Sequence, residues 1–301
     1  MKEKHVFCNP AAFADGKRHT NPDSFILRWC GKYFCYATDE LGVKASVSEN
    51  RTDWTDLGYA IREDAYRNYW APAVIYQNGI FYMYYSNVPA GSEDCHEECL
   101  KLAASDRPEE LSGNPKEVVL PGIRQEIYEE NRFGDERDWY TIEGAAPVAR
   151  GSYFWVLYSA NAYVNEDYFV GFAAAERKND FMAMKWKKFP SEKRWHPLLK
   201  KNGTVEGTGH NTVELAPDLL DEWIIYHGRR ADEEIRPGTE QREMYIEPLY
   251  FNGRQIVCSG PTAQAQDAPG KPDICRKELA VREKCVLAES GDFYVLVCLA
   301  G

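Results

Sequence analysis

The sequence contains no long hydrophobic run, and this absence excludes one broad class of protein. No stretch approaches the roughly 18 apolar residues that a membrane-spanning helix needs, and residues 1–10 lack the apolar core of a secretory signal. We therefore expect a soluble, cytoplasmic protein that has no membrane partner.

An excess of positive charge is also missing. The 36 Lys and Arg residues are outnumbered by 47 Asp and Glu residues, which gives a formal net charge of -11. Nucleic acids attract positively charged surfaces, so this balance argues against a nucleic-acid partner. A neutral, hydroxyl-rich substrate is compatible with it.

Cysteine is present, but its pattern indicates neither a disulfide framework nor a zinc site. The count of nine is odd, so the cysteines cannot all pair within one chain. Residues 95–99, Cys-His-Glu-Glu-Cys, lack the second pair of ligands that a complete zinc site needs. We interpret this cluster as a structural or loop feature and expect no required cofactor.

Four aromatic-rich hairpins hold most of the apolar sequence, each entered through polar or small residues. Val, Ile, Tyr, Phe and Trp dominate them, and Gly31, Gly79 and Gly151 mark the turns of three of them. The hairpins lie at residues 21–38, 69–86, 141–159 and 209–228. Further strand candidates lie at residues 43–48, 100–105 and 169–175. A hairpin with two such strands makes a four-stranded sheet.

Repeated four-stranded sheets predict an all-β fold of the β-propeller type, with a β-sandwich as the alternative. The hairpins open with Asp23, Trp70, Glu143 and His210, all at the same place in their repeat. Because the innermost strands of a propeller begin near its axis, we expect these four residues to converge in one pocket. Two converging carboxylates suggest glycoside hydrolysis, although a random acidic pair is more often solvated on the surface.

An ordered set of motifs resembles glycoside hydrolase family 43. The set includes Asn-Pro-Asp at 21–23, Trp-Ala-Pro at 70–72, Glu-Gly at 143–144, Gly-Thr-Gly-His-Asn at 207–211 and Arg-Glu-Met-Tyr-Ile at 242–246. The resemblance runs from about residue 21 to residue 262. It implies a five-bladed propeller that cleaves α-L-arabinofuranosides or β-D-xylosides with inversion.

The resemblance also implies roles for three of these residues. Asp23 matches the general base that activates water, and Glu143 matches the general acid that protonates the glycosidic oxygen. His210 matches a histidine near the channel axis that is often linked, through water, to a calcium or sodium ion. The structural alternatives are a turn aspartate after Pro22 and a core histidine that bridges strands.

Further residues are candidates for contacts with the substrate. Arg242 matches an arginine that reaches the pocket from the last blade, and Trp70 is expected to form an apolar wall. Trp139 and Tyr140 are additional candidates. The alternatives are packing for Trp70 and pairing with surface acids for Arg242.

One part of the family pattern is absent. The family carries a third acidic residue, which tunes the general acid, in a blade between the Trp-Ala-Pro blade and the Glu-Gly blade. Residues 109–138 contain no aromatic hairpin, so only four blade signatures are visible and one blade core is missing. Asp135 and Asp138 are weak candidates for the tuning acid, and a solvated loop is the alternative for both.

These observations predict a catalytic propeller at residues 1–262, followed by a linker and a strand-rich tail at residues 263–301. Residues 278–298 read as a hairpin that fills the place of the missing blade, caps the ring or pairs with another chain. The expected activity is exo-acting hydrolysis of oligosaccharides. The alternatives are a carbohydrate-binding propeller without turnover and a transglycosylating or phosphorolytic relative. The sequence leaves the oligomeric state open.

Overall fold

The structure is a computed structural model that describes residues 10–90, 98–132, 134–217, 219–234, 236 and 239–270, together with two strands of the tail. Three members of the Cys-His cluster, residues 95–97, lie outside the described residues. None of the described helices has the length and apolar character needed to cross a membrane.

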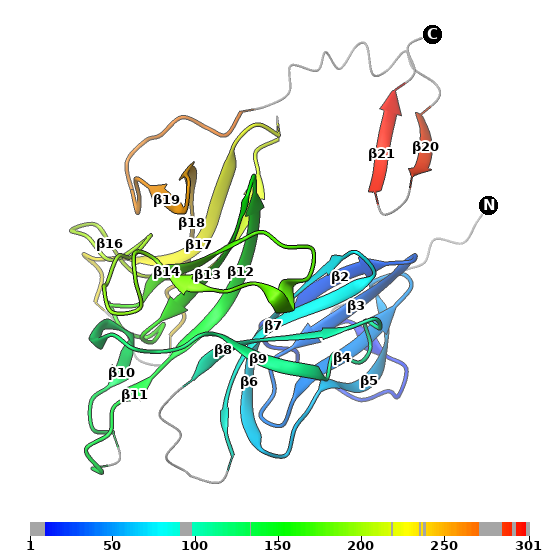
Figure 1. Cartoon of the computed structure of the whole chain (residues 1–301), viewed down its shortest axis with the longest axis horizontal. Helices are drawn as coiled ribbons and strands as arrows, with labels where there is room; N and C mark the ends of the chain where they lie inside the picture. The colour runs from blue at the N-terminus through cyan, green and yellow to red at the C-terminus, as the bar shows by residue number, and fades with distance from the viewer. Residues whose placement is uncertain are drawn as a thin grey trace.

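Four mostly antiparallel sheets follow one another along the chain (Figure 1). The first consists of β2 (Phe25–Trp29), β3 (Lys32–Ala37), β4 (Val43–Ser48) and β5 (Asp53–Ile61), with the short β1 (Ala12–Phe13) parallel to β5. The second consists of β6 (Tyr66–Gln77), β7 (Ile80–Pro89), β8 (Cys99–Ser105) and β9 (Gly113–Val119).

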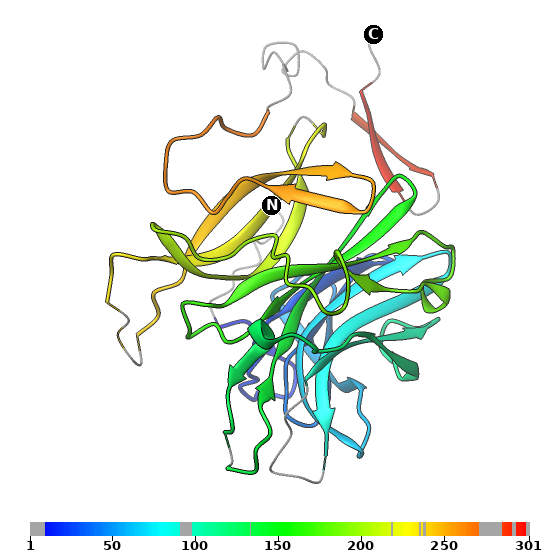
Figure 2. The same cartoon turned by 60° about the vertical axis from the view of Figure 1, so that its left-hand side comes forward.

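The third sheet consists of β12 (Ile142–Arg150), β13 (Tyr153–Ala160), β14 (Phe169–Glu176) and β15 (Lys187–Lys188). The fourth consists of β16 (Val205–Leu215), β17 (Glu222–Arg230), β18 (Glu243–Asn252) and β19 (Gln255–Cys258). Each of the four predicted hairpins forms the first two strands of one sheet. In the first sheet the short β1 precedes this hairpin in the chain. The propeller-like arrangement of these sheets confirms the predicted all-β fold (Figure 2).

Apolar side chains from both faces of the middle sheets join each sheet to its neighbour. Tyr36 of the first sheet packs in one cluster with Met83 of the second, and Leu102 of the second packs in another with Val156 of the third. A third cluster joins the third sheet to the fourth, where Ile224 is buried. Among the described residues, no such cluster joins the fourth sheet back to the first. The ring of blades is therefore open at that point.

The blade expected between the second and third sheets is missing from the structure. In the described part of residues 120–141 the chain forms the 3-10 helix η1 (Arg124–Glu126) and a short hairpin of β10 (Ile127–Glu129) with β11 (Trp139–Tyr140). Sheets two and three instead pack directly against each other. The opening of the ring thus lies between the fourth and first sheets, away from the position where the sequence lacks a blade.

A buried ion pair fixes the segment that replaces the missing blade. The Glu126 side chain is fully buried and accepts a hydrogen bond of 2.6 Å from the Lys188 Nζ, which is also buried. It also accepts bonds from the Tyr158 hydroxyl and from the backbone N–H groups of Gly122 and Ile123. These bonds hold the segment against the third sheet, next to the hairpin that reaches the pocket.

The tail contains β20 (Cys285–Ser290) and β21 (Phe293–Cys298), which pair as an antiparallel hairpin. This pairing agrees with the strand, turn and strand predicted from residues 278–298. The proposed division into domains at residue 262 stays a prediction.

Candidate active site

Irregular backbone at the innermost strands places the candidate residues. The pairing of β6, β12 and β16 with their neighbours shifts register next to Trp70, Glu143 and Gly209. The next residue in each strand has a positive φ, 46° at Ala71, 66° at Gly144 and 47° at His210. Such bulges re-aim side chains near active sites. Asp23 reaches the same region from a turn before β2, with a φ of 51°.

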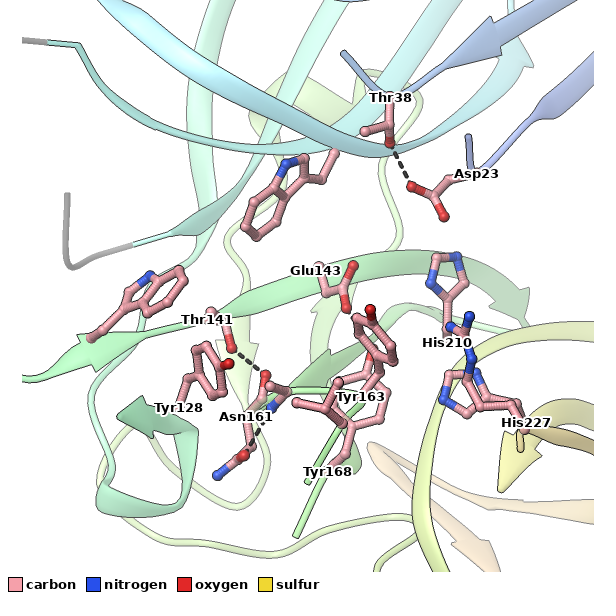
Figure 3. A pocket seen from close by; sticks show the side chains of 15 residues that line it. Asp23, Thr38, Tyr128, Thr141, Glu143, Asn161, Tyr163, Tyr168, His210 and His227 are labelled. Carbon is pink, nitrogen blue, oxygen red and sulfur yellow. Dashed lines mark hydrogen bonds between the residues drawn. The ribbon is translucent and has the colours of Figure 1, made fainter. Parts of the chain in front are cut away.

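These side chains meet around a cavity of about 420 Å³ that draws residues from all four sheets and from the β10–β11 hairpin. The volume falls in the range of about 300 to 1,000 Å³ that is typical of ligand pockets. Its lining is Asp23, Thr38, Trp70, Tyr128, Trp139, Thr141, Glu143, Asn161, Ala162, Tyr163, Val164, Tyr168, His210, His227 and Arg242. Figure 3 shows the Asp23 and Glu143 carboxylates facing the same space, with His210 beside them.

The Asp23 carboxylate is exposed to the cavity and oriented by a single side chain. The Thr38 hydroxyl donates a bond of 2.6 Å to Oδ2 of Asp23 and accepts one of 2.9 Å from the backbone N–H of Ala71 (Figure 3). This relay connects the first sheet to the inner strand of the second. It fixes one carboxylate oxygen of Asp23 and leaves the other facing the cavity.

The Glu143 carboxylate is half-buried and is held by a tyrosine. The Tyr168 hydroxyl donates a bond of 2.6 Å to Oε1 of Glu143. Tyr168 is fully buried, and this burial, followed by the charge of Glu143, raises the pKa of its hydroxyl well above the usual value. Tyr168 therefore stays protonated and acts as a donor.

His227 packs against the ring of Tyr168. The His227 ring stacks on the Tyr168 ring, with centroids 5.5 Å apart and planes inclined by 10°. Burial, and after it the positive charge of Arg242, lowers the pKa of His227 to about 3. His227 is thus neutral at physiological pH, and its role in the pocket is to pack against Tyr168.

Aromatic rings form part of the cavity wall. Trp70 and Trp139 line the cavity as predicted, and Tyr128 packs on Trp139 with ring centroids 4.7 Å apart. Tyr140 does not line the cavity. Successive side chains of a strand point to opposite sides, so β11 can present only one of its two aromatic residues to the pocket.

Arg242 also lines the cavity and pairs with Glu240. Its Nε donates a bond of 2.7 Å to Oε1 of Glu240, and its guanidinium lies 4.5 Å from the centroid of the Tyr163 ring. The hydrogen bond from Arg242 is the main reason why the pKa of Glu240 falls to about 2. Arg242 thus keeps its positive charge next to the pocket.

The two candidates for a tuning acid lie elsewhere. Asp135 pairs with Arg137, with 2.6 Å between Oδ2 and Nη2, and Asp138 accepts a bond from the backbone N–H of Asn131. Neither lines the cavity, where Asp23 and Glu143 are the only carboxylates among the described residues. The position of the family's third acid is therefore not filled by a carboxylate in the described part of the chain.

His210 lines this cavity and also a second cavity that follows the inner strands of all four sheets. Its backbone N–H donates a bond of 2.7 Å to the Ser159 hydroxyl, and its ring lies against the backbone of Gly144. The described residues contain no group of three or more His, Cys, Asp or Glu side chains able to hold a metal. The calcium or sodium ion linked to His210 through water stays a prediction.

Residues 17–114 match the family model for glycosyl hydrolases family 43. Over these residues the chain is similar to family 43. The matched residues include Asp23 and Trp70 and end before Glu143. The fold is similar to that in the crystal structure of a thermostable family-43 glycoside hydrolase, with a TM-score of 0.50 and 23% identity, covering 88% of this chain and 100% of that one.

Curated relatives of the chain include two proteins named probable arabinan endo-1,5-alpha-L-arabinosidase C. The one from Aspergillus niger is 39% identical over 135 residues, which are 42% of this chain and 40% of that protein. The one from Aspergillus fumigatus is 30% identical over 96 residues, 30% of each chain. The chain thus matches less than half the length of these relatives.

Several residues of the pocket carried no recognisable signal in the sequence. Tyr168 precedes β14 without a motif around it. His227, by contrast, lies in the Tyr-His-Gly-Arg stretch at residues 226–229, which belongs to the motifs that resemble family 43. One signal for Tyr168 was indirect. A Cβ on Gly209 would lie 1.8 Å from Cε1 of Tyr168, so the glycine in the Gly-Thr-Gly-His-Asn motif makes room for this ring.

Proposed function

We propose that this chain is an inverting glycoside hydrolase that removes α-L-arabinofuranosyl or β-D-xylosyl residues from the ends of oligosaccharides. The observation that carries the proposal is the position of Asp23 and Glu143, which line one cavity from the turn before β2 and from β12. An inverting glycosidase needs two carboxyl groups that flank the scissile bond and leave space for a water molecule.

In the proposed mechanism, Glu143 donates its proton to the glycosidic oxygen while Asp23 removes a proton from the attacking water. The bond between the anomeric carbon and the leaving oxygen breaks as the bond to the water oxygen forms on the opposite face of the sugar. Thr38 occupies one oxygen of Asp23 and Tyr168 occupies one oxygen of Glu143. Each carboxyl group thereby keeps one oxygen for the reaction.

The remaining lining suits a neutral sugar. Trp70 and Trp139 offer apolar ring surface for the C–H groups of a sugar ring, and Arg242 and Asn161 supply polar groups at the cavity wall. The proposed partner is therefore an oligosaccharide. The names of the two relatives describe endo-acting enzymes on 1,5-linked arabinan, so internal cleavage of arabinan is the main competing specificity.

A second candidate function is carbohydrate binding without turnover. It is favoured by one observation, because no third carboxylate accompanies Asp23 and Glu143 in the cavity among the described residues. The resemblance assigns the support of the general acid to a third acidic residue, so its absence from the cavity weakens the case for turnover.

A panel of nitrophenyl glycosides tests both candidates. Release of nitrophenol from an α-L-arabinofuranoside or a β-D-xyloside, with NMR detection of the inverted anomer as the first product, is the expected result. A rise in melting temperature with these sugars but no release would support the binding protein instead. Monosaccharide as the first product from 1,5-arabino-oligosaccharides would support exo action, and a ladder of shorter oligosaccharides would support endo action.

A further inference from the structure

The fourth sheet has an apolar face that no other described element covers. Its opposite face is buried, with Ile224 and Leu249 packed against the third sheet. On the uncovered face, Met244, Ile246 and Tyr250 of β18 are 79%, 38% and 59% exposed. The register places Ile225 opposite Ile246 and Trp223 opposite Pro248. We call this set, Trp223, Ile225, Met244, Ile246, Tyr250 and Val257, the open face.

The open face borders the opening in the ring. A second cavity, of about 510 Å³, is lined by Phe25 of the first sheet and by Thr212 and Ile225 of the fourth. Small residues of the inner strands of the second and third sheets, including Ala73 and Ala145, also line it. This cavity follows the inner strands of all four sheets, and the open face reaches it at Ile225.

Contiguous apolar patches of this kind are rare on soluble monomeric proteins and indicate a surface that another element covers. Where two other sheets pack against each other, the apolar side chains between them are buried, unlike those of the open face. Trp155 and Phe172, for example, are each 1% exposed at the contact of the third and fourth sheets. The open face needs a partner that is itself apolar.

The tail hairpin has the required composition. Its register pairs Val286 with Val297, Leu287 with Leu296 and Ala288 with Val295, and most residues of the two strands are apolar. An isolated two-stranded hairpin is marginally stable at best in water, so this largely apolar hairpin needs a surface to pack against. The space between two sheets offers such a surface.

The tail also leaves the propeller at the right place. After β19 the chain returns along the fourth sheet, where the backbone N–H of Thr262 donates a bond of 2.8 Å to Oε1 of Glu247. Further on, Nε2 of Gln266 donates to the backbone carbonyl of Ile246, at 3.2 Å, so the chain passes next to the residue at the centre of the open face. The linker of residues 271–284 then spans at most about 50 Å when fully extended. This reach covers the open face, and tethering makes the contact intramolecular.

We propose that the β20–β21 hairpin packs on the open face of the fourth sheet, inside the opening between the fourth and first sheets, and so closes the ring within one chain. This inference stands on packing alone and does not depend on the proposed glycosidase activity. The competing occupant is a second copy of the chain, whose open face or hairpin would cover the same surface.

A photo-crosslinking experiment on the full-length chain distinguishes these occupants. A photoreactive amino acid replaces Ile246, isotope-labelled and unlabelled chains are mixed, and mass spectrometry identifies the linked peptides. We expect links from position 246 to residues 285–298 within one chain. Links that join labelled to unlabelled chains would overturn the proposal in favour of a dimer, and an absence of links to the hairpin would overturn it outright.

The same photoreactive residue at Leu120 is the matched control. Leu120 is 48% exposed at the end of the second sheet and should give no link to the hairpin.

A second experiment measures how a charged residue on the open face changes the melting temperature. Ile246→Asp places a carboxylate at a surface that the proposal buries, so the melting temperature should fall by several degrees relative to wild type. Leu120→Asp, made at a surface that stays exposed, should leave it nearly unchanged. Equal melting temperatures for the two variants would contradict the proposal that the hairpin covers the open face. The comparison requires only that both variants fold.

Discussion

The Tyr168 hydroxyl donates a hydrogen bond of 2.6 Å to Oε1 of Glu143. This bond joins the inner strand of the third sheet, β12, to a neutral donor that directly precedes β14. Because Tyr168 is fully buried and stacked on His227, its hydroxyl has little freedom to move. The Glu143 side chain is therefore positioned by packing as well as by hydrogen bonding.

Tyr168→Phe should lower kcat roughly tenfold, because a carboxyl group that is less well positioned transfers its proton less efficiently. The phenylalanine ring keeps the stacking contact with His227 and removes only the hydroxyl. Measurement of kcat and of the melting temperature in both proteins checks this. An unchanged kcat would limit Tyr168 to a packing role.

Glu143→Gln should abolish turnover of unactivated oligosaccharides, because an amide cannot donate the proton that the leaving oxygen needs. Nitrophenyl substrates need less acid assistance and should retain more activity, and sugar binding measured by calorimetry should persist. Glu176→Gln, at the exposed end of β14, is the matched control. Activity of Glu143→Gln within a few-fold of wild type on oligosaccharides would remove Glu143 from the acid role.

Asp23→Asn should lose activity on good and poor leaving groups alike, because water still needs a base when acid assistance does not matter. The ratio of kcat/KM for dinitrophenyl and alkyl glycosides separates this behaviour from that of Glu143→Gln. Asp64→Asn, an exposed change far from the cavity lining, serves as the control. A defect confined to poor leaving groups would require the two roles to be exchanged.

The four hairpins and the convergence of Asp23, Trp70, Glu143 and His210 were predictable from the sequence. Alternation of aromatic and β-branched residues determines the strands, and the repeated position of the four residues indicates a shared axis. The family's ordered motifs then indicated which acid and which base to expect. Trp139 lines the cavity and its neighbour Tyr140 does not. The sequence alone could not distinguish them, because the register of the two-residue strand β11 decides which side chain points into the cavity.

The part that could not be predicted depends on packing between distant segments. Tyr168 reaches Glu143 only because Gly209, on another sheet, leaves space for its ring. The sequence also did not predict where the ring of sheets is open. The missing blade lies between the second and third sheets in sequence, but those sheets close on each other through their apolar faces, and the opening forms between the fourth and first.

The buried pair of Glu126 and Lys188 gives a prediction about stability. Lys188→Met leaves the fully buried Glu126 carboxylate without its cation, which should lower the free energy of unfolding by about 3 to 5 kcal/mol. The double variant Glu126→Gln with Lys188→Met removes both charges and should recover much of that loss. Denaturant unfolding of the three proteins checks this, and a double variant no more stable than Lys188→Met would contradict it.

The lowered pKa of His227 predicts acid sensitivity of the fold. An unfolded histidine titrates near pH 6.5, whereas His227 in the folded state has a pKa of about 3, mainly because of burial. Between these values the unfolded chain binds one more proton than the folded chain, so stability falls as the pH decreases, by about 1.4 kcal/mol per pH unit from this group. The stabilising contribution is complete above about pH 6.5 and is lost progressively below it.

His227→Gln should therefore flatten the dependence of the unfolding free energy on pH between about 6.5 and 3 relative to wild type. The variant is expected to be less stable near neutral pH, because the stacking contact with Tyr168 is lost, so the informative quantity is the slope rather than the absolute value. His196→Gln removes an exposed imidazole and should leave that slope unchanged. If the slopes of wild type and His227→Gln coincide, a neutral His227 beneath Tyr168 is not what limits the acid stability of this propeller.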